Sequence, residues 1–266
     1  LGGMLTAGLI SPGYGGFKAD SANIRIAFDG PRIALDHFDL SYDRLILQAA
    51  GVFDTTAAKG SLDVGLWTVE SLLDDIDTAN SQDFSRMVSV GEITSTFSLP
   101  DDIGYVFQIH GRDIRTGLAG IIAKPAAAID GYLDFDMLLS GSQTDPAGRL
   151  SAAVRSIDLQ GVHIDSVLAD AILEDGRLSL ESLDLFAPHR AMSAAAAVEL
   201  KRAPDGIPVF DSTCAIVGNL SINDFDLKAL VPFMTSGGLV SGSASARLSW
   251  NGTLTGLQPE GWLTLS

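Results

Sequence analysis

The sequence predicts an all-β fold, a long, twisted and mostly antiparallel sheet built from repeated hairpins. Apolar residues alternate with polar or small residues in many short runs, which is the pattern of strands with one apolar face. Asx-Gly pairs separate several of these runs, and such pairs supply the positive φ that tight hairpin turns require. A ten-residue unit also recurs along the chain, which indicates a repeat-built protein.

The repeat is clearest in Gly176–Leu185 and Gly218–Leu227, whose sequences GRLSLESLDL and GNLSINDFDL share their spacing without gaps. A third copy, Asp29–Leu40, matches if Pro31 is a one-residue insertion, and Asp130–Phe135 is a looser fourth. We interpret each unit as a strand, a glycine turn and a second strand. Units with the same spacing should keep one register, so equivalent apolar residues should share one face.

Five Asx-Gly pairs predict hairpin turns. Because a two-stranded hairpin is only marginally stable, we expect the hairpins to join into one continuous sheet. The pairs are Asp29-Gly30, Asp130-Gly131, Asp175-Gly176, Asp205-Gly206 and Asn251-Gly252.

Helix is predicted only as short inserts at an edge or rim of the sheet. Thr68–Ile76 and Gln82–Val90 have helical spacing and suggest an insert over residues 68–90. Asp226–Val231 could form a turn or two before Pro232.

Composition argues against several classes of function. The formal net charge is −16, which disfavours a nucleic-acid partner and adhesion to anionic lipid surfaces. No run approaches the roughly 18–20 apolar residues of a membrane-spanning helix. Cys214 is the only cysteine, so neither an internal disulfide nor a cysteine-built zinc site is expected.

We expect residues 1–266 to be a single β segment from the interior of a longer protein. The chain starts at Leu1 rather than Met, and it stops within the strand-like run that ends at Ser266. A signal or an anchor would then lie outside this segment.

The residues that carry chemistry form no recognisable catalytic or metal-binding pattern. The four histidines are scattered and lack the spacing of a metal motif. Asp134 and Asp136 would share one face of a strand, and we interpret them as part of a solvated outer face rather than as calcium ligands or paired catalytic carboxylates. The sequence therefore predicts no catalytic site, no cofactor and no metal.

The C-terminal part of the chain resembles the repeating segments of the AsmA-like superfamily, which includes the TamB-like proteins. The resemblance rests on the Gly-rich strand Gly238–Trp250, the turn Gly252-Thr253-Leu254 and the segment Pro259-Glu260-Gly261. It implies an open U-shaped β-groove with a hydrophobic floor and a role in carrying phospholipid between two membranes. It also implies the periplasm of a diderm bacterium, a parent protein anchored in the inner membrane, and an outer-membrane barrel protein as a partner. The apparent helical insert departs from the plainest segments of that family.

Two functions remain open on this evidence, with an enzyme as a weak third. In the first, the apolar stripe lines a groove that holds phospholipid acyl chains, which the small residues Ala194–Ala197 favour because they leave space beside larger ones. In the second, a structural or adhesive secreted repeat protein buries the same stripe in a closed core. The predicted lining residues are Ile24, Ile26, Phe28, Ile33, Leu35, Leu178, Leu180, Leu220, Ile222, Leu248, Trp250 and Leu254.

Overall fold

The described residues of this computed structural model consist of strands, turns and loops, with no helix among them. The predicted all-β class is confirmed. The described residues are 2–11, 13–14, 17–42, 45–69, 87–99, 104–116, 129–159, 162–187, 189–226, 242–253 and 255–265.

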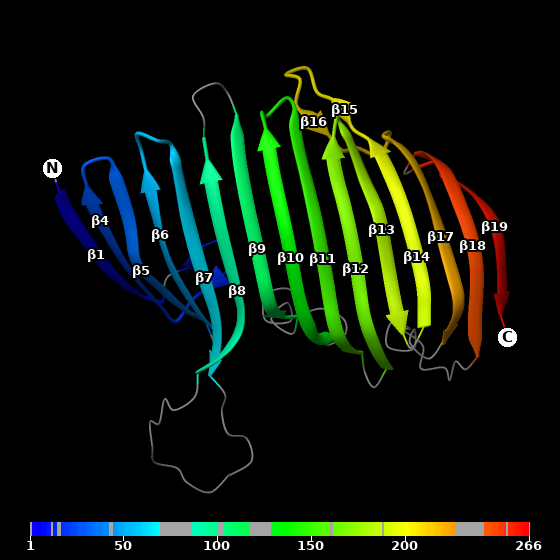
Figure 1. The fold of residues 1–266 in the computed structure, drawn as a ribbon, viewed down its shortest axis with the longest axis horizontal. Helices are drawn as coiled ribbons and strands as arrows, with labels where there is room; N and C mark the ends of the chain where they lie inside the picture. Colours follow the sequence, from blue (N-terminus) through cyan, green and yellow to red (C-terminus); the bar gives the residue numbers. More distant parts are fainter. Residues whose placement is uncertain are drawn as a thin grey trace, which may run out of the picture. The chain divides into compact units, whose positions relative to one another are not determined.

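Fifteen strands form one large antiparallel sheet (Figure 1), in the order β1-β4-β5-β6-β7-β8-β9-β10-β11-β12-β13-β14-β17-β18-β19. Because β1 and β19 each have a single neighbour, the sheet is not closed. Two further strand pairs, β2 with β3 and β15 with β16, stand apart from it.

The chain divides into two compact units, which are described separately. Unit 1 comprises residues 1–101 and 109–114, and unit 2 comprises residues 102–108 and 115–266. The strands of unit 1 are β1 (Gly2–Ile10), β2 (Gly13–Tyr14), β3 (Phe17–Lys18), β4 (Ser21–Asp29), β5 (Arg32–Tyr42), β6 (Leu45–Asp54), β7 (Lys59–Val69) and β8 (Met87–Ser98). Strand β9 (Tyr105–Arg115) contributes residues to both units. The strands of unit 2 are β10 (Ile129–Gly141), β11 (Pro146–Leu159), β12 (Val162–Glu174), β13 (Arg177–Ala187), β14 (His189–Glu199), β15 (Lys201–Arg202), β16 (Pro208–Val209), β17 (Ala215–Asp226), β18 (Ser243–Thr253) and β19 (Gln258–Leu265).

Three of the five predicted turns are hairpin turns. Asp175 and Gly176 have φ of 52° and 73° and join β12 to β13, as a tight type I′ turn requires. Asp205-Gly206 lies in the loop between β15 and β16. The turn at Asp29-Gly30 is shifted by one residue, because Asp29 still pairs with Arg32 and the loop is Gly30-Pro31.

The other two turn predictions are wrong. Asp130-Gly131 lies inside β10, where the register with β11 shifts between Asp130 and Tyr132. Asn251-Gly252 lies near the end of β18, and the chain leaves the sheet only after Thr253. A glycine in a strand interior is also typical of a bulge or a close backbone approach, and that reading applies at Gly131.

The predicted helical insert is wrong at both of its described ends. Strand β7 continues through Val69 and β8 begins at Met87, with Thr68 paired to Val88. Several residues here are β-branched and favour a strand when a neighbouring strand is available for pairing. Residues 70–86 lie outside the described residues. Asp226 ends β17, and residues 227–231 also lie outside the described residues.

The repeat unit contains a β-bulge at the same position in each of its three clear copies. The register shifts by one residue within Leu35–Phe38 of β5, Leu180–Leu183 of β13 and Ile222–Phe225 of β17. In each copy two consecutive polar residues separate two apolar ones, a spacing that would send the second apolar residue to the opposite face of a regular strand. The extra residue of the bulge keeps both on one face. The repeat therefore encodes a bulged strand.

The described residues contain few fully buried side chains. The buried apolar residues are mostly small, and only Leu66, Val90, Ile157, Ile164 and Ile216 are larger aliphatic ones. No polar or charged residue among those described is buried. In the described ranges no helix has the length and apolar character needed to cross a membrane. Most large apolar side chains lie half-buried on the sheet.

Candidate functional site

The register of unit 2 places a continuous set of apolar residues from eight strands on one face. Directly paired residues of antiparallel strands point to the same side of a sheet, so a face can be followed from strand to strand. Leu180 pairs with Ala171 on one side and with Ala196 on the other, and Ala196 leads through Gly218 to Trp250. Repeating this for each row defines the apolar face of unit 2. Its residues are Leu133, Phe135, Met137 and Leu139 of β10; Gly148, Leu150, Ala152 and Val154 of β11; Val167, Ala169, Ala171 and Leu173 of β12; Leu178, Leu180, Leu183 and Leu185 of β13; Met192, Ala194, Ala196 and Val198 of β14; Ile216, Gly218, Leu220, Ile222 and Phe225 of β17; Ala244, Ala246, Leu248 and Trp250 of β18; and Pro259, Gly261, Leu263 and Leu265 of β19.

Within these rows no hydroxyl, amide or charged side chain interrupts the apolar face of unit 2, and beyond Val167 strand β12 continues on this side with Asp165 and His163. Many of its side chains are partly open to solvent: Leu178 is 42% exposed, and Leu263 and Leu265 are 62% and 63% exposed. Soluble proteins rarely leave a contiguous apolar patch of this extent uncovered unless it binds something.

Side-chain size varies across the apolar face of unit 2. The two inner rows carry small residues such as Ala152, Ala171, Ala194 and Gly218, whereas the outer rows are mostly Leu, Val and Ile. At Gly218 a Cβ would lie 2.5 Å from Cζ2 of Trp250, so the indole ring occupies the space above the glycine.

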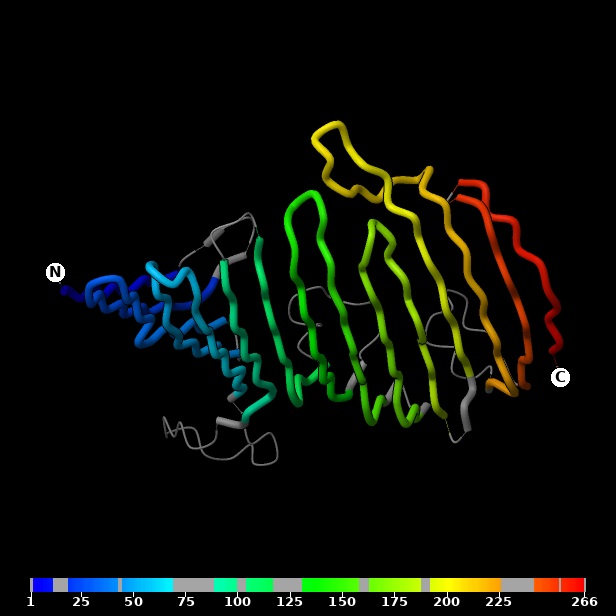
Figure 2. Tube along the Cα trace, turned by 45° about the horizontal axis from the view of Figure 1, so that its top comes forward, coloured from blue at the N-terminus to red at the C-terminus, as the bar shows by residue number. Residues whose placement is uncertain are grey.

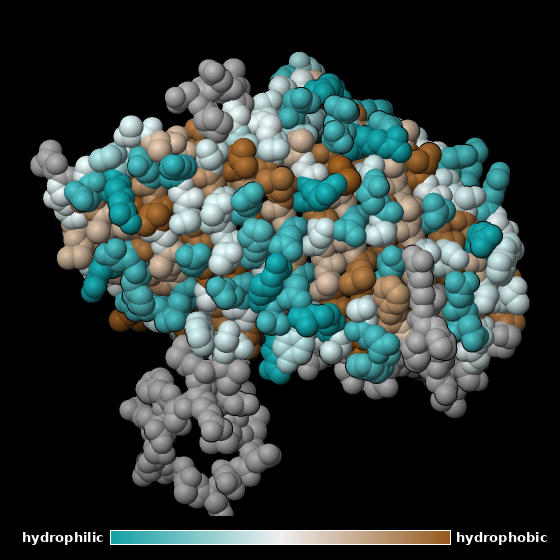
Figure 3. Space-filling view, in the orientation of Figure 1, coloured by the Kyte–Doolittle hydropathy of each residue, from teal (hydrophilic) through white to brown (hydrophobic). Residues whose placement is uncertain are grey.

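The opposite face of unit 2 is mainly polar, with scattered apolar side chains such as Leu138, Leu168 and Val217. Arg155 Nη2 lies 2.6 Å from Asp134 Oδ2, and Ser151 Oγ donates to Asp170 Oδ1 at 2.5 Å. Hydrophilic residues are interspersed with apolar ones over the face seen in Figure 3. Asp134 and Asp136 share this face, as expected for alternate positions of one strand.

Unit 1 has an apolar face of its own. Ile24, Ile26 and Phe28 of β4 pair with Phe38, Leu35 and Ile33 of β5. The same face continues through Leu47, Ala49 and Phe53 of β6, Leu62, Val64 and Leu66 of β7, and Ile93 and Phe97 of β8, with Leu5 and Leu9 of β1 on its other side. Its one polar side chain in these rows, Ser95, donates from Oγ to the carbonyl of Leu62 at 3.1 Å.

The residues predicted to line the groove fall on these two faces. Five of them share the apolar face of unit 1: Ile24, Ile26, Phe28, Ile33 and Leu35. Six share the apolar face of unit 2: Leu178, Leu180, Leu220, Ile222, Leu248 and Trp250. The register puts Ser179 and Ser221 on the opposite face. Leu254 lies outside the described residues.

The predicted lining residues include none from β10–β12, β14 or β19. Leu150 and Ala171, for example, belong to the apolar face of unit 2 although their strands contain no copy of the repeat. Period-2 alternation was present in these strands, but the bulges and the small residues hid which of the two alternating sets was the apolar one.

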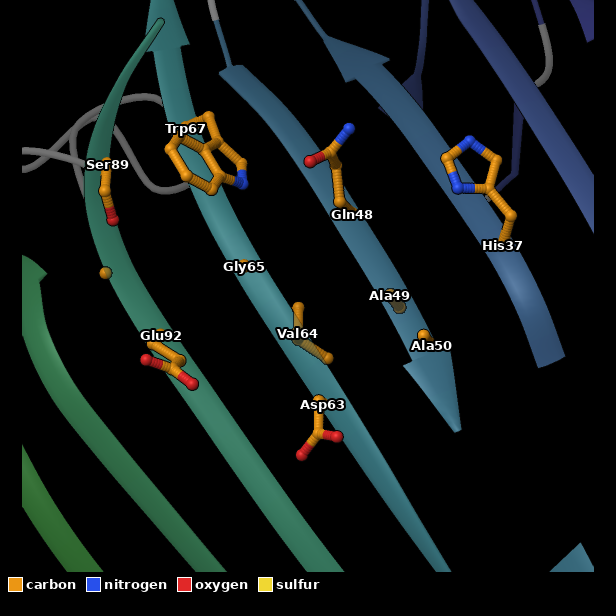
Figure 4. Close-up of a pocket in the computed structure, with 11 residues that line it drawn as sticks. His37, Gln48, Ala49, Ala50, Asp63, Val64, Gly65, Trp67, Ser89 and Glu92 are labelled. Atoms are coloured by element: carbon orange, nitrogen blue, oxygen red, sulfur yellow. The ribbon is translucent and has the colours of Figure 1, made fainter. Parts of the chain in front are cut away.

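A shallow hollow of about 430 Å³ lies on the polar side of unit 1 (Figure 4). Trp67 stands beside Gly65, whose missing side chain leaves room for the indole, since a Cβ there would lie 2.8 Å from Trp67 Nε1. Gln48 of β6 and His37 of β5 approach from the other side, and Gln48 Nε2 donates to Asp39 Oδ1 at 3.1 Å. The hollow is open, and among the described residues Trp67 Nε1 is buried without a hydrogen-bond partner.

The titratable residues form local pairs rather than a cluster. His37 contacts the carboxylate of Asp39, and His163 Nε2 lies 3.4 Å from Asp165 Oδ1, each two residues along the same strand. Among the described residues no group of three His, Cys, Asp or Glu side chains could hold a metal ion.

Comparisons with protein-family models, curated proteins and solved structures found no match to this chain. The apolar faces are therefore the features from which a function can be argued.

Proposed function

We propose that this chain holds the acyl chains of phospholipids against its apolar faces, as one segment of a periplasmic, bridge-like lipid transport protein that serves outer-membrane assembly. In this proposal the sheet curls about its apolar side into an open U-shaped groove, and the parent protein is anchored in the inner membrane of a diderm bacterium. Its ligand is the acyl chain, and neither a cofactor nor a catalytic group takes part.

One observation carries the proposal: every position followed on the apolar face of unit 2 is apolar, over eight adjacent strands. A face exposed to water would tolerate scattered polar residues, and the polar face of the same strands contains many. Selection for an unbroken apolar face is expected where a long, flexible hydrocarbon must lie at many alternative positions.

The energetics favour hydrocarbon as the ligand. Each CH₂ removed from water contributes about 0.8 kcal/mol, so one acyl chain could be held without any contact to its headgroup. The face offers no cation to a phosphate, and the net charge of −16 opposes headgroup attraction elsewhere on the surface. The small residues of the inner rows leave space in which a chain could lie between the larger outer rows.

A photo-crosslinking experiment in cells tests this proposal. A photoreactive amino acid at Leu180 or Ile222 should label phospholipid, whereas the same residue at Ser179 or Ser221 should not, because those positions lie on the opposite face. Extracted lipid would be identified by mass spectrometry.

Equal labelling from both faces, or no labelling from either, would contradict the proposal. Crosslinks from Leu180 to a second polypeptide instead of lipid would favour the alternative, a structural or adhesive repeat protein in which another layer of protein covers the apolar face.

A further inference from the structure

A small lobe interrupts the simple hairpin pattern of unit 2. Strands β14 and β17 are paired as far as Glu199 and Ala215, yet residues 200–214 join them instead of a tight turn. These residues, called here the rim lobe, contain β15 and β16 and rise from one rim of the sheet (Figure 2). By contrast, Asp175-Gly176 joins β12 to β13 at this rim with two residues.

The rim lobe has a defined internal structure. Cys214 is 0% exposed, with its Sγ accepting from the amide of Asp211 at 3.4 Å. The side chain and amide of Thr213 donate to the carboxylate of Asp211, and these hydrogen bonds lower the pKa of Asp211 below its ordinary value. The carbonyl of Ala203 accepts from the amide of Gly206 at 2.8 Å.

The rim lobe is bonded to two other turns of unit 2. The amide of Leu200 donates to the carbonyl of Gly176 at 2.8 Å, which ties the lobe to the β12–β13 turn. Arg202 reaches the loop between β10 and β11, where Nη1 donates to the carbonyl of Thr144 and Nη2 lies 3.7 Å from Asp145 Oδ1. A Cβ on Gly206 would lie 3.3 Å from Cγ2 of Thr144, so the two loops also pack closely.

These contacts span strands that are not neighbours. The lobe leaves from β14, whereas the loop that Arg202 contacts belongs to β10 and β11, with the β12–β13 hairpin between them. Three strand spacings correspond to roughly 14 Å along the sheet. Curling or flattening of this part of the sheet changes the distance between those strand ends, so it must strain or break the contacts of Arg202.

We propose that the rim lobe is a strap that fixes the curl of strands β11–β14 at one rim and so limits how far the apolar face of unit 2 can open there. The proposed limit on opening of the apolar face rests on the proposed lipid function, whereas the proposed restraint on the curl of the sheet does not. The pairing of neighbouring strands restrains each strand against the next, and the contacts of Arg202 add a restraint that spans several strands.

Hydrogen exchange of the 266-residue chain tests whether the rim lobe restrains the sheet. Arg202→Ala is the variant and Arg177→Ala is the control. Arg177 is matched in type and exposure, but its partner Glu199, at 3.0 Å, lies on the adjacent strand β14. Arg202→Ala should speed exchange at Asp145 and Leu200 by roughly two- to fivefold, the range for losing exposed charged contacts. Arg177→Ala should leave the amide of Asp145 unchanged.

Replacement of residues 200–214 by Asn-Gly provides a second variant, in which a two-residue turn joins Glu199 to Ala215. We expect circular dichroism of this variant to retain the strand signal and exchange to rise at the ends of β10 and β11. The strap is disproved if Arg202→Ala and Arg177→Ala give the same exchange at Asp145, or if the β10 and β11 ends stay protected without the lobe. If the replacement fails to fold, the comparison of the two arginine variants decides.

Lipid labelling distinguishes the restraint on the sheet from the limit on opening of the apolar face. A photoreactive residue at Leu178, in the row nearest this rim, should lose phospholipid labelling when the lobe is replaced, whereas Leu185 at the other end of β13 should keep it. Faster exchange without a loss of labelling at Leu178 would contradict only the claim that the lobe limits opening of the apolar face. Absence of labelling at both positions in the unmodified chain would instead contradict the proposed function.

Discussion

Ser179 and Leu180 are neighbours in β13, yet they belong to two chemically different surfaces. Ser179 shares its face with Ala197 and Val217, within a surface that includes ion pairs, whereas Leu180 shares its face with Ala171 and Ala196 in rows without a polar side chain. The difference shows that strand alternation alone, maintained over eight strands, creates both surfaces. It also shows why bulges matter, since each unit must correct its spacing to stay in phase.

The largest expected effect comes from a charge on the better-packed part of the apolar face. Ile216 is 8% exposed and Val217 is 47% exposed, although they are adjacent in β17. Ile216→Asp should lower the free energy of unfolding by at least about 3 kcal/mol, because packing is lost and a carboxylate is desolvated. Val217→Asp should change it by less than about 0.5 kcal/mol. Urea unfolding of both variants measures this, and similar losses would show that the two faces are equally buried.

Deletions in β13 test whether the bulge keeps the faces in phase. Removing Glu181 leaves Leu180 and Leu183 two positions apart, so both stay on the apolar face and stability should change little. Removing Ser179 makes Leu178 and Leu180 adjacent, so one leucine must turn to the polar face at a cost of about 1.5–3 kcal/mol. Thermal and urea unfolding would compare the two deletions. A larger loss for the Glu181 deletion would mean that the bulge has another role.

A smaller effect is expected from filling the space beneath Trp250. A Cβ at Gly218 would lie 2.5 Å from Trp250 Cζ2 and 2.8 Å from the carbonyl oxygen of Ala195, so Gly218→Ala should destabilise by about 1–3 kcal/mol. Gly3→Ala is the control, because nothing lies within 4 Å of a Cβ there. Tryptophan fluorescence should shift only in the Gly218 variant, and an unchanged spectrum would argue that the ring is not seated on the glycine.

The smallest effect should come from the polar face. Arg155 and Asp134 form an ion pair at 2.6 Å, with the arginine side chain 50% exposed. Arg155→Ala should cost no more than about 1 kcal/mol, and the loss should shrink at high salt because exposed pairs are screened. Unfolding at two salt concentrations checks this. A cost independent of salt would indicate that the aliphatic part of Arg155, rather than its charge, stabilises the face.

The sequence was informative where a pattern determined both the spacing and the turn. Asp175-Gly176 predicted its hairpin because two consecutive residues with positive φ are tolerated there by Asp and Gly. The six predicted residues of unit 2 that are described share one face, because the repeat preserves register. The same pattern was ambiguous at Gly131, since a glycine serves equally in a turn and in a strand interior approached by a neighbouring backbone.

Helical spacing was misleading where strands were long. Thr68 and Val88 pair across β7 and β8, and local propensity could not reveal a partner more than a dozen residues away. The rim lobe was also beyond sequence reasoning, since Asp205-Gly206 predicted its turn but nothing in the chain indicated that Arg202 would reach Thr144.

The single thiol of the chain is buried in the rim lobe. Alkylating reagents attack the exposed thiolate, so Cys214 should react only when the rim lobe opens around it, because the contacts of its Sγ are to Asp211 and Val209 of the lobe. The rate at which Cys214 is alkylated then measures how often the lobe opens. The measurement needs no substitution and no added label. The loop that interrupts the regular hairpins thus contains a natural reporter of its own movement.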